Sequence, residues 1–239
     1  MILENTPYWE VMRTIKDEME KVSYFVNKTN RLGFSAVFND GANVYYKTYT
    51  HPQSKNTYMY WGGRIVTPVR FTNLHGDNYR SGFCLLVNTS DGGRMVYCTG
   101  KMNDEGKKVD SLLLYTSHFF KRYRERAGLP DNMPTNELIC NYFNRNTEYM
   151  PLDYKQVSRR DDADGTALQN YDGVTLGRVM RIEDDGYEFI MVKNNTFLPQ
   201  SMLKPNQTDA LMDEDKIQAI IAENMREIVK NHPVLSKYQ

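Results

Sequence analysis

Two hairpin signals constrain the fold of this chain more than any other feature of its sequence. Asp91-Gly92-Gly93 and Asp184-Asp185-Gly186 each stand between two runs with the composition of β-strands. The four runs span residues 82–89, 94–101, 174–183 and 187–195. Asp-Gly turns between such runs are typical of tight β-hairpins. The sequence therefore predicts two antiparallel strand pairs far apart in the chain.

Helical patterns separate and flank these strands. Thr6 and Pro7 are suited to a helix N-cap and first helical position, and Gly128 followed by Pro130 stops a helix that Thr116 or Ser117 can cap. The predicted helices cover residues 7–30, 117–127, 135–145 and 213–231. The chain is thus expected to be α+β, with one or more antiparallel sheets built from hairpins and packed with N-terminal, central and C-terminal helices.

Aromatic residues are concentrated in the short strands predicted between residues 34 and 80. The relevant side chains are Tyr45, Tyr46, Tyr49, Tyr58, Tyr60 and Trp61. Such rings can form a stacking platform for bases, but half-buried sheet faces use the same residues more often. Both interpretations remain open at this point.

Residues 150–172 are polar and show no period, which predicts a long loop. Asp162, Asp164 and Gly165 resemble part of a calcium loop, but that alignment puts Arg160 and Tyr171 where carboxylates are required. No metal or cofactor is therefore predicted.

The overall composition limits the partners. The chain has 30 basic and 30 acidic residues and a formal net charge of zero, so attraction to nucleic acid requires a local patch. No basic leader and no apolar run of membrane-spanning length is visible, and the three cysteines are odd in number and widely spaced. We expect a cytoplasmic protein with no membrane association.

The segment Tyr115–Arg126 carries the most site-like pattern. On a helix, His118, Arg122 and Arg126 stand one above another at spacings of four, beside an apolar face that includes Tyr123. The helix start and two arginines disfavour a charged imidazole, and guanidinium groups hold phosphates well. The stripe predicts phosphodiester chemistry without a metal; the alternative is a solvated helix face on which Glu125 pairs with Lys121 or Arg122.

This pattern resembles the barnase/RelE-like superfamily of small metal-independent ribonucleases and toxins. The matching pieces are the His118 stripe, the helix at 135–145, and the strands at 174–195, which are followed by Thr196. The resemblance covers residues 111–203 and implies that Thr196 returns to a cleft beside His118. It allows a division of the single globular unit, 1–239, into a Tyr-rich half at 1–110, a RelE-like core at 111–203 and a C-terminal helix at 208–231.

The leading hypothesis is a metal-independent ribonuclease-like protein, toxin-like or encoded by a phage or mobile element. His118 would be the general base or acid, Arg122 and Arg126 would hold phosphate, and Tyr123 and Thr196 would supply hydroxyl groups. The alternative is a non-catalytic binding module for a nucleic-acid or protein partner, such as an antitoxin-like protein. A purely structural domain is the third hypothesis. The oligomeric state is not predicted.

Overall fold

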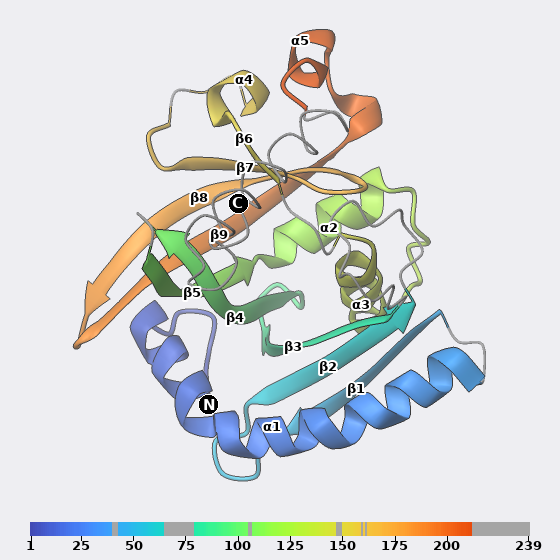
Figure 1. Cartoon of the computed structure of the whole chain (residues 1–239), viewed down its shortest axis with the longest axis vertical. Coiled ribbons are helices and arrows are strands. Elements are labelled where there is room, and N and C mark those ends of the chain that lie inside the picture. The colour runs from blue at the N-terminus through green and yellow to red at the C-terminus, as the bar shows by residue number, and fades with distance from the viewer. Residues whose placement is uncertain are drawn as a thin grey trace, which may run out of the picture.

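The computed structural model describes residues 1–39, 43–64, 79–104, 107–146, 150–158, 160 and 162–211. Its elements combine helices and strands, which confirms the predicted α+β class (Figure 1). In chain order they are α1 (Tyr8–Asn39), β1 (Val44–Thr50), β2 (Thr57–Arg64), β3 (Tyr79–Asn88), β4 (Arg94–Asp104), β5 (Lys107–Tyr115), α2 (Ser117–Arg126), α3 (Thr135–Arg145), β6 (Met150–Leu152), α4 (Tyr154–Ser158), β7 (Gly165–Gln169), β8 (Gly173–Asp184), β9 (Tyr187–Pro199), the 3₁₀ turn η1 (Gln200–Met202) and α5 (Pro205–Thr208).

The nine strands of the described residues form one sheet in the order β1-β2-β3-β4-β5-β9-β8-β7-β6. Neighbours are antiparallel except β5 and β9, which run parallel, so the expected hairpin-built antiparallel sheet is only partly right. Parallel neighbours need a long crossover connection, and the chain between β5 and β9 supplies one that includes α2 and α3. Strands on both sides of residue 110 belong to this sheet.

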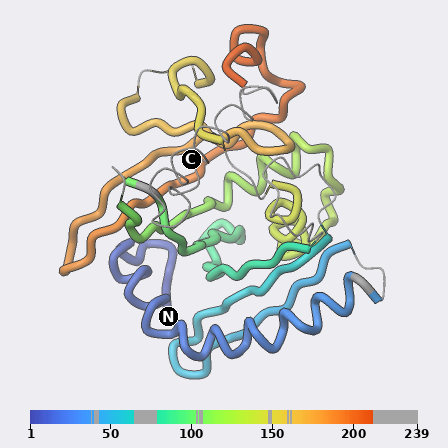
Figure 2. The backbone as a smooth tube through the Cα atoms, in the orientation of Figure 1, coloured from blue at the N-terminus to red at the C-terminus, as the bar shows by residue number. Residues whose placement is uncertain are grey.

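Both hairpin signals lie at tight turns, as predicted. The first connects β3 to β4, and Gly92 adopts φ +78° there. The second connects β8 to β9, where Asp185 has φ 48° and Gly186 has φ 75°. Positive φ at both central residues is the requirement of a type I′ turn. β8 and β9 therefore run on as a long two-stranded ribbon, which Figure 2 shows as adjacent orange tubes.

Helix α1 covers one face of the sheet and continues nine residues past the predicted end, to Asn39 rather than residue 30. Residues 34–39, expected to begin the strands, are helical. Gly33 lies inside the helix at a close approach, because a Cβ atom there would be 2.8 Å from the hydroxyl of Tyr79. Apolar side chains of α1 pack on those of the sheet. The side chains of α1 include Val11, Met12, Ile15 and Val22, and those of the sheet include Tyr58, Leu85, Tyr97 and Leu112.

Helices α2 and α3 lie on the opposite face (Figure 1). Their buried aromatic side chains meet one another and the sheet in edge-to-face contacts; the cluster includes Tyr115, Phe119, Phe120, Tyr123, Tyr142, Phe143 and Phe197. Aromatic pairs favour this geometry. Because Phe119, Phe120 and Tyr123 point into the core, the other side of α2 faces outward.

The aromatic residues of the N-terminal part also belong largely to the interior. Tyr58, Tyr60 and Trp61 on β2 are buried. Rings that are buried in this way are closed to stacking with bases. The half-buried sheet face is thus the better interpretation of these three rings, whereas Tyr45, Tyr46 and Tyr49 on β1 are partly exposed.

The prediction of a loop over residues 150–172 is wrong, because this stretch contains β6, α4 and β7. Val157 of α4 packs on Ala167 of β7 and Val174 of β8 in a small separate core. Elements of three to five residues are too short to show a period in the sequence. The predicted C-terminal helix, 208–231, lies outside the described residues beyond Leu211.

Candidate functional site

Helix α2 presents the predicted stripe because its ends are well defined. The Thr116 side chain caps the helix by accepting a hydrogen bond from the Phe119 N–H at 3.1 Å, and Gly128 follows its end with φ +64°. Both features are the ones predicted from the sequence. With Phe119 and Tyr123 buried, His118 is left exposed and the two arginines partly exposed.

His118 and Arg122 form one contact of the stripe. The Nε atom of Arg122 donates to Nε2 of His118 at 3.3 Å, so Nε2 is the acceptor of this hydrogen bond. Arg122 also pairs with Glu125 at 2.9 Å, with both side chains about two-fifths exposed. A pair this exposed contributes little to stability. The local partner expected for a solvated face is therefore present.

Arg126 and Thr196 form the second contact. Arg126 donates to Oγ1 of Thr196 at 3.4 Å and to the carbonyl oxygen of Phe197. β5 pairs with β9 only as far as Asn194, so both acceptors lie on the part of β9 beyond that pairing. Burial lowers the pKa of Arg126, and the nearby positive charge of Arg122 lowers it further. The structure thus brings Thr196 to Arg126 and not into contact with His118.

Tyr123 is directed elsewhere. Its hydroxyl donates to Oδ2 of Asp172 at 2.9 Å, and Asp172 also accepts from Arg145 at 2.6 Å and from the side chain of Asn146 at 2.9 Å. Burial, and then the negative charge of Asp172, raise the pKa of Tyr123 strongly. This hydroxyl therefore joins α2 and α3 to the β7–β8 turn inside the molecule and does not support the stripe.

A polar hollow of about 470 Å³ lies next to Thr196, between α4 and the β8–β9 pair. It is lined by Tyr154, Ser158, Arg160, Asp162, Leu176, Gly177, Arg178, Lys193, Asn195 and Thr196. Arg178 pairs with Asp162 at 2.9 Å, while Arg160 and Lys193 pair with no carboxylate of the described residues. Among the described lining residues, three cations stand against one carboxylate, which favours a positive charge in the hollow.

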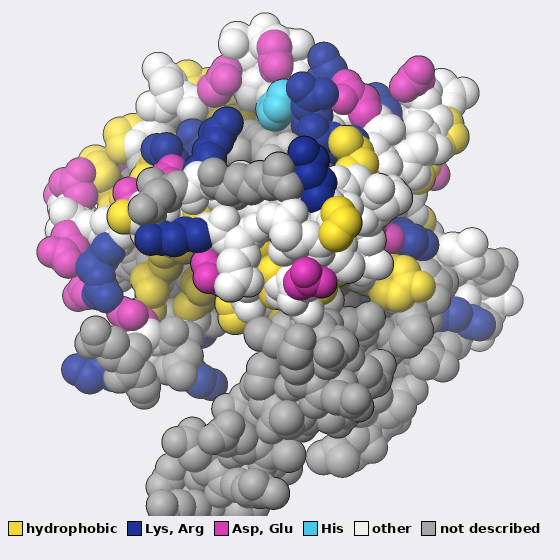
Figure 3. All heavy atoms as spheres, turned by 90° about the horizontal axis from the view of Figure 1, so that it is seen from above, with side chains coloured by type: hydrophobic (Ala, Val, Ile, Leu, Met, Phe, Trp, Pro, Cys, Tyr) yellow, Lys and Arg dark blue, Asp and Glu magenta, His cyan; other side chains and the backbone are white. Residues whose placement is uncertain are grey.

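The two groups of cations are joined by Thr196, which contacts Arg126 and also lines the hollow. We call the joined surface the basic band; it consists of His118, Arg122, Arg126, Arg160, Arg178, Lys193 and Thr196. Figure 3 shows Lys and Arg side chains gathered with a histidine on one face of the molecule. Arg178 and Lys193 face each other as cross-strand partners, which explains their proximity.

Sequence reasoning missed Arg178 and Lys193. Arg160 entered the sequence analysis only as a misfit in the calcium-loop alignment, and neither Arg178 nor Lys193 differs from an ordinary strand residue in the sequence. Only the pairing of β8 with β9 brings them together.

No cluster of metal ligands occurs among the described residues. The carboxylate of Asp162, a ligand position in the rejected calcium-loop alignment, instead accepts hydrogen bonds from the Arg178 side chain and from the backbone N–H of Asp164. The band therefore offers cations and hydroxyl groups, which suit an anionic ligand.

Comparisons with known proteins return no match: no family model, curated protein or solved structure is similar to this chain. The resemblance to the barnase/RelE-like superfamily stays a prediction. In the described part of the chain, no helix combines the length and apolarity that crossing a membrane requires.

Proposed function

We propose that this protein binds RNA through the basic band. The observation that carries the proposal is the position of Thr196, which links Arg126 of α2 to the hollow that holds Arg160, Arg178 and Lys193. The chain as a whole has no net charge, so this concentration of cations is local. Arginine and lysine side chains with neighbouring hydroxyls and amides are the usual partners of the phosphate backbone.

Binding without cleavage is the mode that the contacts favour. The Nε2 lone pair of His118 is occupied by Arg122, which is held in turn by Glu125. Tyr123 is engaged with a buried carboxylate. Of the five candidate catalytic residues, only Thr196 lines the hollow. A catalytic base and its phosphate clamps need to surround one reacting atom, whereas a binding band needs only continuity.

The test is a fluorescence anisotropy titration with a labelled single-stranded RNA at about 50 mM and about 200 mM salt. Binding should weaken steeply with salt, and Arg160→Ala and Lys193→Ala should each reduce affinity and lower the salt slope by about one. Lys47→Ala is the matched control, since Lys47 is exposed on β1 at the far edge of the sheet. Absence of salt-dependent binding would overturn the proposal and leave a protein partner, such as an antitoxin-like one, as the alternative.

A second candidate function is metal-independent RNA cleavage with His118 as general base. The observation that favours it is the exposed position of His118 at the start of α2, beside the partly exposed Arg122 and Arg126. The protein and its His118→Ala variant should be incubated with RNA in chelator, with Lys47→Ala as the folded control. Loss of cleavage in His118→Ala alone supports this function, and equal cleavage by all three proteins, or none, contradicts it.

A further inference from the structure

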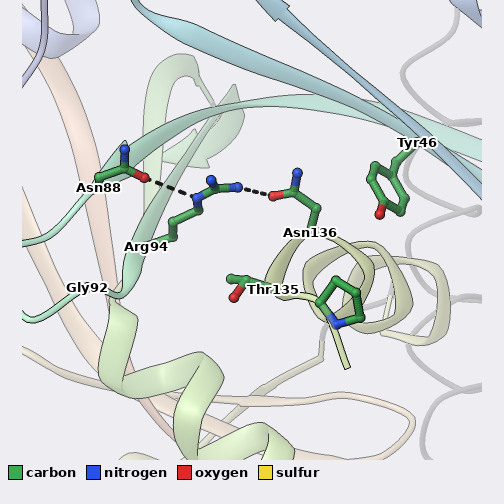
Figure 4. Close-up of a pocket in the computed structure, with 7 residues that line it drawn as sticks. Tyr46, Asn88, Gly92, Arg94, Thr135 and Asn136 are labelled. Atoms are coloured by element: carbon green, nitrogen blue, oxygen red, sulfur yellow. Dashed lines mark hydrogen bonds between the residues drawn. The ribbon is translucent and has the colours of Figure 1, made fainter. Parts of the chain in front are cut away.

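A second hollow, of about 310 Å³, lies on the α2–α3 side of the sheet and does not contain any residue of the basic band. Its polar lining comes from Tyr46 on β1, Asn88 on β3, Arg94 on β4, and Thr135 and Asn136 at the start of α3. Figure 4 shows Arg94 between Asn88 and Asn136, with Tyr46 on the other side of Asn136. Side chains from the neighbouring strand β3 and from the more distant β1 and α3 thus surround Arg94 of β4.

Arg94 is held in place by neutral groups. Its Nε donates to Oδ1 of Asn88 at 3.1 Å, and one terminal nitrogen donates to Oδ1 of Asn136. It pairs with no carboxylate of the described residues. Asp91, close by in the chain, instead accepts from Thr89, Gly93 and Ser117 and does not line the hollow.

The consequence is a fixed guanidinium whose charge is not neutralised. Two amides use the Nε and one N–H of Arg94, and its remaining donors have no acceptor among the described residues, so they can serve a ligand. A group held in this way loses little conformational entropy on binding, and its fork of donors matches phosphate or carboxylate oxygens.

We propose that this hollow binds a phosphate monoester of mononucleotide size, with the phosphate on Arg94. The volume is at the small end of ordinary ligand pockets. The Thr135 hydroxyl is a further donor for phosphate oxygens, and the Tyr46 ring provides an aromatic surface for a planar base. The proposal is independent of RNA binding by the basic band.

Isothermal titration calorimetry with adenosine monophosphate and with inorganic phosphate tests the assignment. The mononucleotide should bind one site per chain, more tightly than phosphate. Arg94→Ala should weaken it tenfold or more, because a charge-assisted contact to phosphate is lost, and Arg94→Lys should weaken it less. Tyr46→Leu should weaken the mononucleotide severalfold and leave inorganic phosphate unchanged.

The controls separate this hollow from the band. Lys193→Ala should leave mononucleotide binding unchanged, and thermal melting checks that each variant is folded; Arg94→Lys serves if Arg94→Ala does not fold. The assignment is wrong if neither probe binds saturably, if both arginine variants bind like the parent, if phosphate binds as tightly as the mononucleotide, or if Lys193→Ala weakens binding as much as Arg94→Ala.

Discussion

Replacing Asp172 by alanine should reduce the free energy of unfolding by about 2–6 kcal/mol. The substitution leaves the Tyr123 hydroxyl and the Asn146 amide, both in buried side chains, without their acceptor. Each unsatisfied buried donor costs about 1–3 kcal/mol. Arg145 adds little, because its side chain is 40% exposed and regains water when Asp172 is lost. The sum is therefore set by the two buried donors.

Urea unfolding of the parent, Asp172→Ala and Asp162→Asn measures this difference. Asp162 also pairs with an arginine, but Arg178 is 57% exposed, so its loss should cost less than about 1 kcal/mol. The two variants thus compare the stability lost when a largely buried aspartate loses its partners with the stability lost at a more exposed Asp–Arg pair. If Asp172→Ala loses no more stability than Asp162→Asn, the buried donors do not carry the energy assigned to them.

The same network predicts a pH dependence. Burial alone raises the pKa of Asp172, but hydrogen bonds from Arg145, Asn146 and Tyr123 outweigh it and set the pKa below its ordinary value of 3.8. A lowered pKa in the folded state means that this stability is present above about pH 4 and is lost as the pH falls through the folded pKa. The difference in the free energy of unfolding between the parent and Asp172→Asn, measured with urea, should therefore become smaller as the pH falls from 5 to 3. A constant difference across that range would contradict the assignment.

Three further substitutions test how α2 is held. Thr116→Ala removes the side-chain cap of α2 and should cost about 1 kcal/mol in urea unfolding. Phe119→Ala empties a fully buried position and should cost about 3–5 kcal/mol in the same assay. Tyr123→Phe removes one donor to Asp172 and should cost about 1 kcal/mol, while RNA affinity in the anisotropy assay stays unchanged because this hydroxyl lies outside the basic band.

The features that the sequence predicted well depend on neighbouring residues. The turn at Asp185-Gly186 needs only two residues that accept positive φ. The start of α2 needs only a hydroxyl at Thr116 and an N–H three residues later. The His118–Arg122 contact follows from helical spacing alone. Each of these features depends on residues no more than four positions apart, so the sequence alone is enough to predict it.

The features that the sequence did not predict depend on distant segments. The parallel pairing of β5 with β9 joins two strands that are separated along the chain by α2, α3 and three further strands. α1 continues past residue 30 through Gly33, where the helix passes close to Tyr79 of β3. β7 is paired with β8 on one side and with β6 on the other.

The hollow of the basic band shows why a site of this kind cannot be read from alternation along a strand. Side chains of a regular strand point to opposite faces in turn, so Asn195 and Thr196 should be separated by the sheet. The pairing of β9 with β8 shifts by one residue between Leu176 and Gly177, and both Asn195 and Thr196 then line the same hollow. A bulge that redirects a side chain in this way is a recurring device near functional sites. It is also what allows Thr196 to line the hollow and still accept from Arg126, so the continuity of the band depends on a single extra residue in β9.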